Sequence, residues 1–134
     1  MTRARLISCT ILTAGLLCAC GYPVDVERWI PDFGFTGDHG AIALNATDLV
    51  GALTARYPSQ DEADTRALQL CGNGCGIVLR FEGAGTSGAL ATDSETHFGV
   101  GTGVTPDAAA ATALEQCRTD GGSACAVGLQ GCND

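Results

Sequence analysis

An internal repeat constrains the fold of this chain more than any other feature of the sequence. Residues 39–44 (HGAIAL) align with residues 87–92 (SGALAT), and Val50-Gly51 aligns with Phe98-Gly99. After a two-residue gap, four residues of the first segment match four of the second: Ala63, Ala67, Leu68 and Cys71 align with Ala109, Ala113, Leu114 and Cys117. The match ends with Cys75-Gly76-Ile77, which aligns with Cys125-Ala126-Val127. A segment of about 45 residues that occurs twice indicates one structural unit used twice. We assign residues 39–83 to the first repeat and 84–134 to the second.

Each repeat has the pattern of two strands, a helix and a third strand. A capping box from Ser59 to Glu62 predicts an alanine-rich helix that runs to about residue 70. In the second repeat Thr105 is the expected cap and Pro106 the first residue of a helix to about residue 118. The expected strands include residues 41–44, 50–55, 76–81 and 125–130. We therefore expect an α+β fold in which two tandem ββαβ repeats form an antiparallel sheet, with two Ala-rich helices packed on it.

The cysteines of the repeats are placed for disulfides. In both units one cysteine ends the helix and another opens the next strand, which favours the pairs Cys71–Cys75 and Cys117–Cys125. Other pairings of the five cysteines after Cys20 stay possible on spacing alone. A structural zinc site needs four converging Cys or His ligands, and neither histidine lies near these loops. We expect no metal and no cofactor.

The first twenty residues have the pattern of an export signal with a lipid anchor. Arg3 and Arg5 precede an uncharged, mostly apolar stretch from Leu6 to Leu17, which is too short to span about 30 Å of hydrocarbon. The ending Leu-Cys-Ala-Cys resembles the bacterial lipobox, so we expect residues 1–19 to be a lipoprotein signal peptide and Cys20 to carry the lipid. The alternative is a soluble secreted protein that is cut a few residues later. The lipid would attach the protein to the extracytoplasmic face of a membrane in the cell envelope, and Gly21 permits the outer membrane if the cell has two.

The charge of the chain excludes one class of partner. The chain has 15 acidic residues, seven arginines and no lysine, and Arg3 and Arg5 leave with the signal. Binding to nucleic acid depends on clustered Lys and Arg, so we expect no nucleic-acid partner.

The repeat resembles the family known as domain of unknown function 4189, whose members are small exported bacterial proteins with a duplicated unit. The resemblance is carried by Gly40-Ala41-Ile42-Ala43, the capped helix ending Ala67-Leu68-x-x-Cys71, and their counterparts in the second repeat. It implies a fold and export, and no reaction. Members often have a further cysteine just before the second Gly-Ala-Leu-Ala, which would pair with the terminal one; here residues 83–87 contain none. We therefore expect Cys132 to be an unpaired thiol without an intramolecular partner. It would be a free thiol, a link between two copies of the chain or the remnant of a lost bridge, and we favour the remnant.

Three groups of residues are candidates for a catalytic or phosphate-binding site. His39, His97 and Cys132 are possible catalytic groups, but solvent-exposed histidines at strand ends fit the pattern better. Residues 99–103 (GVGTG) resemble a phosphate-binding loop but alternate along an expected strand, where close packing of a helix explains them. The carboxylates of Asp61, Glu62 and Asp64 suit the positive end of a helix dipole.

Residues 20–38 form an expected linker or arm between the lipid anchor and the repeats. Four of the seven aromatic residues lie in it: Tyr22, Trp29, Phe33 and Phe35. A flexible tether would be polar, so this segment either packs on the sheet as an arm, which we favour, or contacts a partner or membrane through Trp29, Phe33 and Phe35.

These patterns favour a non-enzymatic, envelope-anchored binding module, of which an inhibitor or immunity-type protein is one form. Its partner would be an envelope protein or ligand. The alternatives are a small extracytoplasmic hydrolase or thiol enzyme that uses His39, His97 or Cys132, and a released effector.

Overall fold

The computed structural model describes residues 28–93 and 95–133. The predicted signal peptide and the predicted lipid attachment site, Cys20, lie outside these ranges. The elements, in chain order, are β1 (Trp29–Phe33), β2 (His39–Asn45), β3 (Val50–Tyr57), α3 (Gln60–Cys71), β4 (Gly76–Glu82), β5 (Ser87–Thr92), β6 (Phe98–Gly103), α4 (Pro106–Thr119) and β7 (Ala126–Cys132). The fold class is α+β, as predicted.

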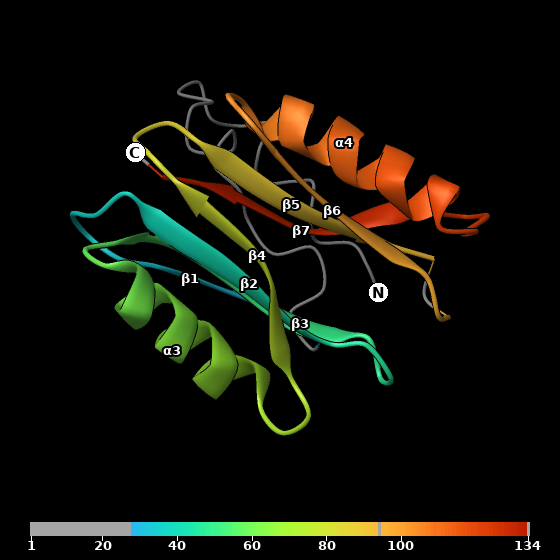
Figure 1. Ribbon diagram of the computed structural model, residues 1–134, viewed down its shortest axis with the longest axis horizontal. Coiled ribbons are helices and arrows are strands. Elements are labelled where there is room, and N and C mark those ends of the chain that lie inside the picture. The colour runs from blue at the N-terminus through green and yellow to red at the C-terminus, as the bar shows by residue number, and fades with distance from the viewer. Residues whose placement is uncertain (1–27, 94, 134) are drawn as a thin grey trace, which may run out of the picture.

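The strands form two sheets, whereas the sequence led us to expect one. The first sheet has the order β1-β3-β2-β4 and the second β6-β5-β7, with antiparallel pairing except between β1 and β3. Figure 1 shows the sheets stacked between the helices, with α3 outside the first sheet and α4 outside the second. Each sheet has large apolar side chains on the face away from its helix. A single sheet with both helices on one face would leave those side chains in water.

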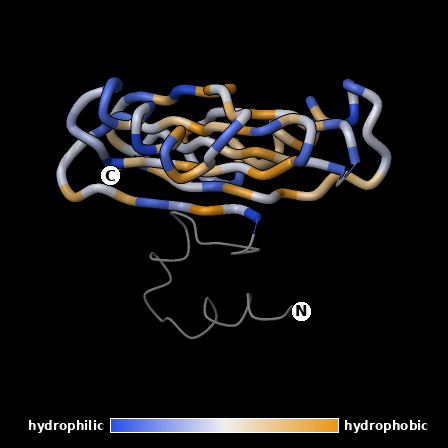
Figure 2. Tube along the Cα trace, turned by 90° about the horizontal axis from the view of Figure 1, so that it is seen from below, coloured by the Kyte–Doolittle hydropathy of each residue, from blue (hydrophilic) through white to orange (hydrophobic). Residues whose placement is uncertain are grey.

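Alternation along the strands separates three apolar layers. Ile42 and Leu44 of β2 face the central core between the sheets, with Leu90 of β5 and Leu129 of β7. The intervening residues are small: Ala41 and Ala43 pack with α3, and the corresponding alanines of β5 pack with α4. The hydropathy tube in Figure 2 shows apolar strand segments through the body and strongly hydrophilic segments in the loops at its ends. Small residues under each helix allow it to lie close to its sheet.

The glycines of β6 are packed under α4, as predicted. A Cβ atom on Gly99 would lie 2.4 Å from the backbone nitrogen of Cys117, and one on Gly101 would lie 2.7 Å from that of Ala113. Both distances are shorter than any real contact of this kind. These glycines therefore serve close helix packing, and their alternation comes from the two-residue period of a strand.

We expect Gly101→Val to destabilise the fold by about 1–3 kcal/mol or more, because the added side chain meets the backbone of α4 and cannot be accommodated by a rotamer change. Urea unfolding followed by circular dichroism measures the effect. Thr102→Ala is the matched control, since Thr102 is exposed on the same strand and should cost less than about 1 kcal/mol. Equal losses in the two variants would contradict the packing argument.

The local features of both helices agree with the sequence analysis. The Ser59 hydroxyl accepts from the Glu62 backbone N–H, and the Thr105 hydroxyl accepts from the Ala108 N–H. The disulfides Cys71–Cys75 and Cys117–Cys125 are both present. They lie where each helix is followed by a strand, so the predicted pairing is confirmed.

Residues 29–33 belong to the folded domain as strand β1, which pairs in parallel with β3. The Trp29 ring is 4 % exposed and occupies the space left by Gly51 and Gly128. The favoured prediction of an arm packed on the sheet is therefore confirmed for this segment. Trp29 contributes to the central core, with the partly buried Phe33 packed against it. The buried Trp29 ring is therefore not open to a partner, contrary to the alternative that the sequence suggested.

Candidate functional site

The loop between β1 and β2 exposes a large aromatic side chain. Phe35 is 91 % exposed, while its backbone neighbours are fixed to the end of β3. The Gly34 N–H donates to the carbonyl of Ala55 at 2.8 Å, and the Gly37 N–H donates to that of Arg56 at 3.0 Å. A Cβ atom on Gly34 or Gly37 would overlap the backbone of Arg56 or Tyr57. The loop thus lies flat on β3 and holds the Phe35 ring in solvent.

A buried asparagine near the C-terminus, Asn133, also holds this region through hydrogen bonds. The Asn133 side chain is fully buried; its Oδ1 accepts from the Arg56 N–H at 2.7 Å, and its Nδ2 donates to the carbonyls of Asp38 and Phe81. Arg56 has a φ of 67°, in the left-handed region that non-glycine residues rarely adopt. Strained residues persist only where surrounding contacts hold them, and they are concentrated at functional sites. Asn133 supplies the contact here.

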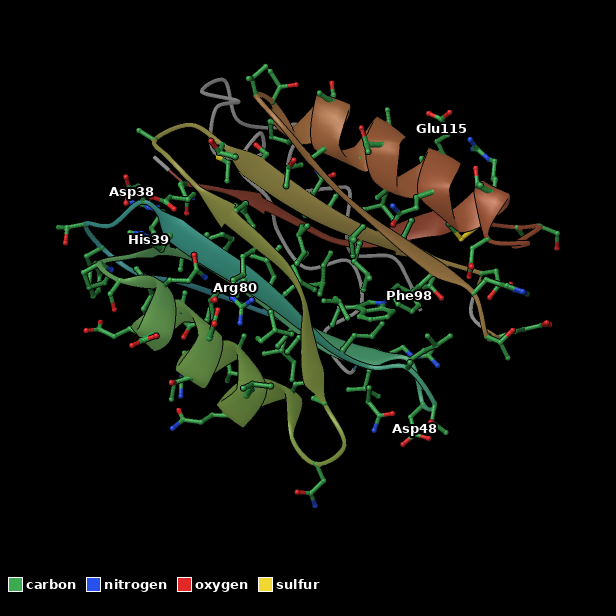
Figure 3. All side chains as sticks on the ribbon, in the orientation of Figure 1. Asp38, His39, Asp48, Arg80, Phe98 and Glu115 are labelled. Atoms are coloured by element: carbon green, nitrogen blue, oxygen red, sulfur yellow. A yellow bond between two sulfur atoms is a disulfide. The ribbon has the colours of Figure 1, made fainter. Side chains whose placement is uncertain are left out.

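We define the Phe35 loop as residues 35–38 together with Arg56 and Pro58, which line one shallow hollow. Asp38 is the acidic residue of this lining. The carboxylates of Asp38 and of Glu82, on β4, are 48 % and 70 % exposed, and they lie 3.1 and 3.6 Å from the two ring nitrogens of His39. Figure 3 shows Asp38 and His39 at one end of the molecule, and Figure 1, in the same orientation, marks the C-terminus at that end. An aromatic side chain held in solvent beside carboxylates can bind a surface; the described loop residues offer no activated nucleophile.

The second histidine belongs to a separate cluster at the opposite end. His97 precedes β6, next to Phe98, which Figure 3 shows far from His39. Its Nδ1 donates to Asp93 Oδ2 at 2.7 Å, the tautomer being assigned from the carboxylate, which can only accept. Nε2 faces Gly121, and within the described ranges no hydroxyl or thiol hydrogen bonds to it. The structure therefore places the two histidines apart, and each is only partly exposed rather than open to solvent.

Asp93 organises the turn before β6. Its Oδ1 accepts from the backbone N–H groups of Glu95, Thr96 and His97 at 2.8 to 3.1 Å. These backbone hydrogen bonds, with the bond from His97, hold the pKa of the Asp93 carboxyl well below its usual value. The carboxylate is thus a structural acceptor in a strand connection.

Because the pKa of Asp93 is lowered on folding from about 3.8, its contribution to stability is present above that pH and is lost as the pH falls below it. We expect Asp93→Asn to unfold more easily at neutral pH and to lose less stability on acidification than the unmodified protein. Urea midpoints measured between about pH 2 and pH 7 test this. Glu95→Gln, at an exposed neighbour, should leave the pH profile unchanged. Parallel profiles for Asp93→Asn and the parent protein would refute the role of Asp93.

Cys132 is disulfide-bonded, and no described cysteine is free. The prediction of an unpaired thiol is therefore wrong. It rested on the absence of a cysteine from residues 83–87, of which Ser87 lies opposite Cys132 in the sheet. The absence of that one partner does not exclude other partners. A sulfur in a disulfide provides no thiolate for attack, which also removes Cys132 from the candidate catalytic residues.

A third polar cluster, which the sequence did not suggest, lies beside α3. Asp32 Oδ2 accepts from the Tyr57 hydroxyl at 2.7 Å and from Arg66 Nε at 2.8 Å. Burial, and then the bond to Asp32, raises the pKa of Tyr57. The cluster ties β1, β3 and α3 together. Of the carboxylates considered in the sequence, Asp61 and Glu62 lie in the first turn of α3, and Asp64 pairs with Arg80 at 2.8 Å.

One protein family matches most of the described chain. The family described as domain of unknown function (DUF4189) matches residues 39–132. The chain belongs to this family. β1, with the buried Trp29, precedes the matched region, while Asn133 follows it directly. The DUF4189 description names no reaction, and neither a curated protein nor a solved structure matches the chain.

No helix among the described residues is both long and apolar enough to cross a membrane. No group of three or more His, Cys, Asp or Glu side chains within residues 28–93 and 95–133 is arranged to hold a metal ion.

Phe35 stands out in the sequence as an aromatic residue of the N-terminal segment, but the residues that position it do not. Asn133 contacts Arg56 across 77 positions of the chain, and nothing near either residue in the sequence indicates the contact. The sequence does contain one indication of this loop, the glycines at positions 34 and 37. Glycines around a lone aromatic residue are typical of a loop that lies against another backbone segment.

Proposed function

We propose that this DUF4189 protein is a membrane-anchored lipoprotein of the cell envelope that binds a partner through the Phe35 loop and catalyses no reaction. One observation carries the binding role: a 91 % exposed Phe on a loop whose backbone is fixed by hydrogen bonds and by the buried Asn133. Fixing a loop before binding lowers the entropic cost of association. Aromatic side chains of this kind supply much of the binding energy in interfaces.

The anchor rests on the sequence of residues 1–20. The folded domain follows closely, since β1 begins at Trp29, nine positions after Cys20. Export also agrees with the disulfides, which persist outside the cytoplasm. A lipid on Cys20 would keep the domain at the membrane surface, where a partner in the same envelope meets it at high effective concentration.

The anchor is tested by expressing the full chain with Cys20→Ser and, as matched control, Cys18→Ser. We expect the parent and the Cys18→Ser protein to enter the detergent phase and to give an N-terminal peptide with a lipid on Cys20. Cys20→Ser should lose both properties. An unmodified N-terminus downstream of Cys20 would instead support a released effector. A disulfide on Cys20 in the mature protein would also contradict the anchor, since one sulfur cannot form both bonds.

The binding role is tested by a photo-crosslinking amino acid placed at position 35 and, as matched control, at position 104. Val104 is 85 % exposed in a different loop, so both positions accept the probe without loss of packing. We expect one adduct of defined mass at position 35 in intact cells and none at 104, and we expect Asn133→Ala to weaken the adduct by loosening the loop. No adduct at 35, or the same adducts at both positions, would count against the proposal.

The alternative of a small hydrolase has one observation in its favour, the 2.7 Å contact between His97 Nδ1 and Asp93. Such a pair orients a general base. Among the described residues, however, no nucleophile lies at Nε2 of His97. The role of the His97–Asp93 pair in the turn before β6 is sufficient to explain the contact. Hydrolysis of an activated ester that is lost in His97→Gln, with folding intact, would revive this alternative.

A further inference from the structure

We propose that Asn73 is a site of spontaneous covalent modification, at which its side-chain amide is converted to aspartate and isoaspartate. Asn73 lies in the loop closed by the Cys71–Cys75 disulfide and is followed by Gly74. The reaction needs an accessible amide carbon, an unhindered backbone nitrogen after it and local freedom to bring the two together. The structure meets the first two conditions at this asparagine, and the flanking glycines favour the third.

The chain has three asparagines, and their surroundings differ sharply. Asn133 is fully buried with its amide in three hydrogen bonds. The Asn45 side chain accepts from the N–H groups of Thr47 and Asp48 and donates to the Asn73 carbonyl. Asn73 is exposed, and no side-chain hydrogen bond within the described residues holds its amide.

The residue after each asparagine separates them further. Gly74 has no side chain to obstruct its nitrogen, and its N–H makes no hydrogen bond within the described part of the chain. Gly72 and Gly74, on either side of Asn73, both have positive φ values, 96° and 80°. Ala46 follows Asn45, and its methyl group hinders the same approach. Asn73 is therefore the reactive position.

The reaction balances without a redox partner. The backbone nitrogen of Gly74 attacks Cγ of Asn73; the N–Cγ bond forms, the bond from Cγ to Nδ2 breaks, and Nδ2 leaves as ammonia with the proton from the Gly74 N–H. Water then adds to one of the two carbonyls of the cyclic imide. Opening on one side yields aspartate, and opening on the other yields isoaspartate with an extra atom in the backbone.

The products change two local interactions. A carboxylate at position 73 lies just after the carboxyl end of α3, where a negative charge is unfavourable. Isoaspartate also shifts the main-chain carbonyl that accepts from Asn45 Nδ2 at 3.1 Å. The turn between β2 and β3 is anchored by that bond, so the modification reaches beyond its own loop.

The test is incubation of the folded, oxidised protein in mildly alkaline buffer, followed by peptide mapping and by enzymatic methylation of isoaspartate. We expect a mass gain of one unit in the peptide containing residue 73, with both isomers present, at a rate at least about tenfold above that at Asn45 or Asn133, where local opening must come first. Asn73→Gln should abolish the signal and remain folded. An unreacted Asn73 in the folded protein, or equal rates at the three asparagines, would overturn the proposal.

Discussion

Replacing Asn133 by alanine is expected to lower the free energy of unfolding by about 2–4 kcal/mol, because the change removes the side-chain hydrogen bonds to three backbone groups. These are the N–H of Arg56 and the carbonyls of Asp38 and Phe81. The Asp38 carbonyl keeps a second donor, the Gly83 N–H, so the loss comes mainly from the other two groups and from the emptied space of the fully buried Asn133 side chain. Urea unfolding monitored by circular dichroism measures the loss.

Asn73→Ala is the matched control for Asn133→Ala. It makes the same substitution at an exposed asparagine and should change stability by less than about 0.5 kcal/mol. Hydrogen exchange supplies a second readout: Asn133→Ala should speed the exchange of the Gly37 and Arg56 amides more than that of amides in α4. A uniform increase would mean that Asn133 stabilises the whole domain without a particular role at the Phe35 loop.

Trp29→Ala is expected to cost about 3–5 kcal/mol, the range for removing a large aromatic side chain from a core. The ring is 4 % exposed between the sheets and lies against Gly51 and Gly128, neither of which can fill the cavity. Calorimetry or circular dichroism is the suitable measurement, because Trp29 is the only tryptophan and its own fluorescence is lost.

Two comparisons make the result for Trp29 specific. Trp29→Phe keeps part of the packing and should cost less than the alanine variant. Phe35→Ala removes an aromatic residue from the same segment at an exposed position and should cost less than about 0.5 kcal/mol. If Trp29→Ala were as mild as Phe35→Ala, β1 would not belong to the cooperative unit.

The proposals for Phe35 and Asn73 concern opposite ends of the domain. The Phe35 loop lies where β1, β3 and β7 end, and Asn73 lies beyond the carboxyl end of α3. Both loops contain glycines, but the two loops differ in whether hydrogen bonds hold the group on which the proposal rests. The Phe35 loop is fixed by hydrogen bonds, whereas the Asn73 amide is exposed with no such bond among the described residues.

Local signals in the sequence were sufficient for the elements of the repeats, their caps and two disulfides. Ser59 and Thr105 cap the helices within three residues, and Cys71–Cys75 and Cys117–Cys125 close short loops. Such features depend on neighbours along the chain, so a single sequence displays them. The alternating glycines of β6 were interpreted correctly for the same reason.

The arrangement of those elements was decided by tertiary structure. The sequence alone determined an α+β chain of the DUF4189 type with two Ala-faced helices. Only the folded structure decided that the strands divide into two stacked sheets, that Trp29 lies between them and that Asn133 supports the Phe35 loop. The first two depend on burying large apolar faces that belong to distant segments, and the third depends on hydrogen bonds between residues far apart in the chain. Contacts between distant segments leave no periodic signal in either segment.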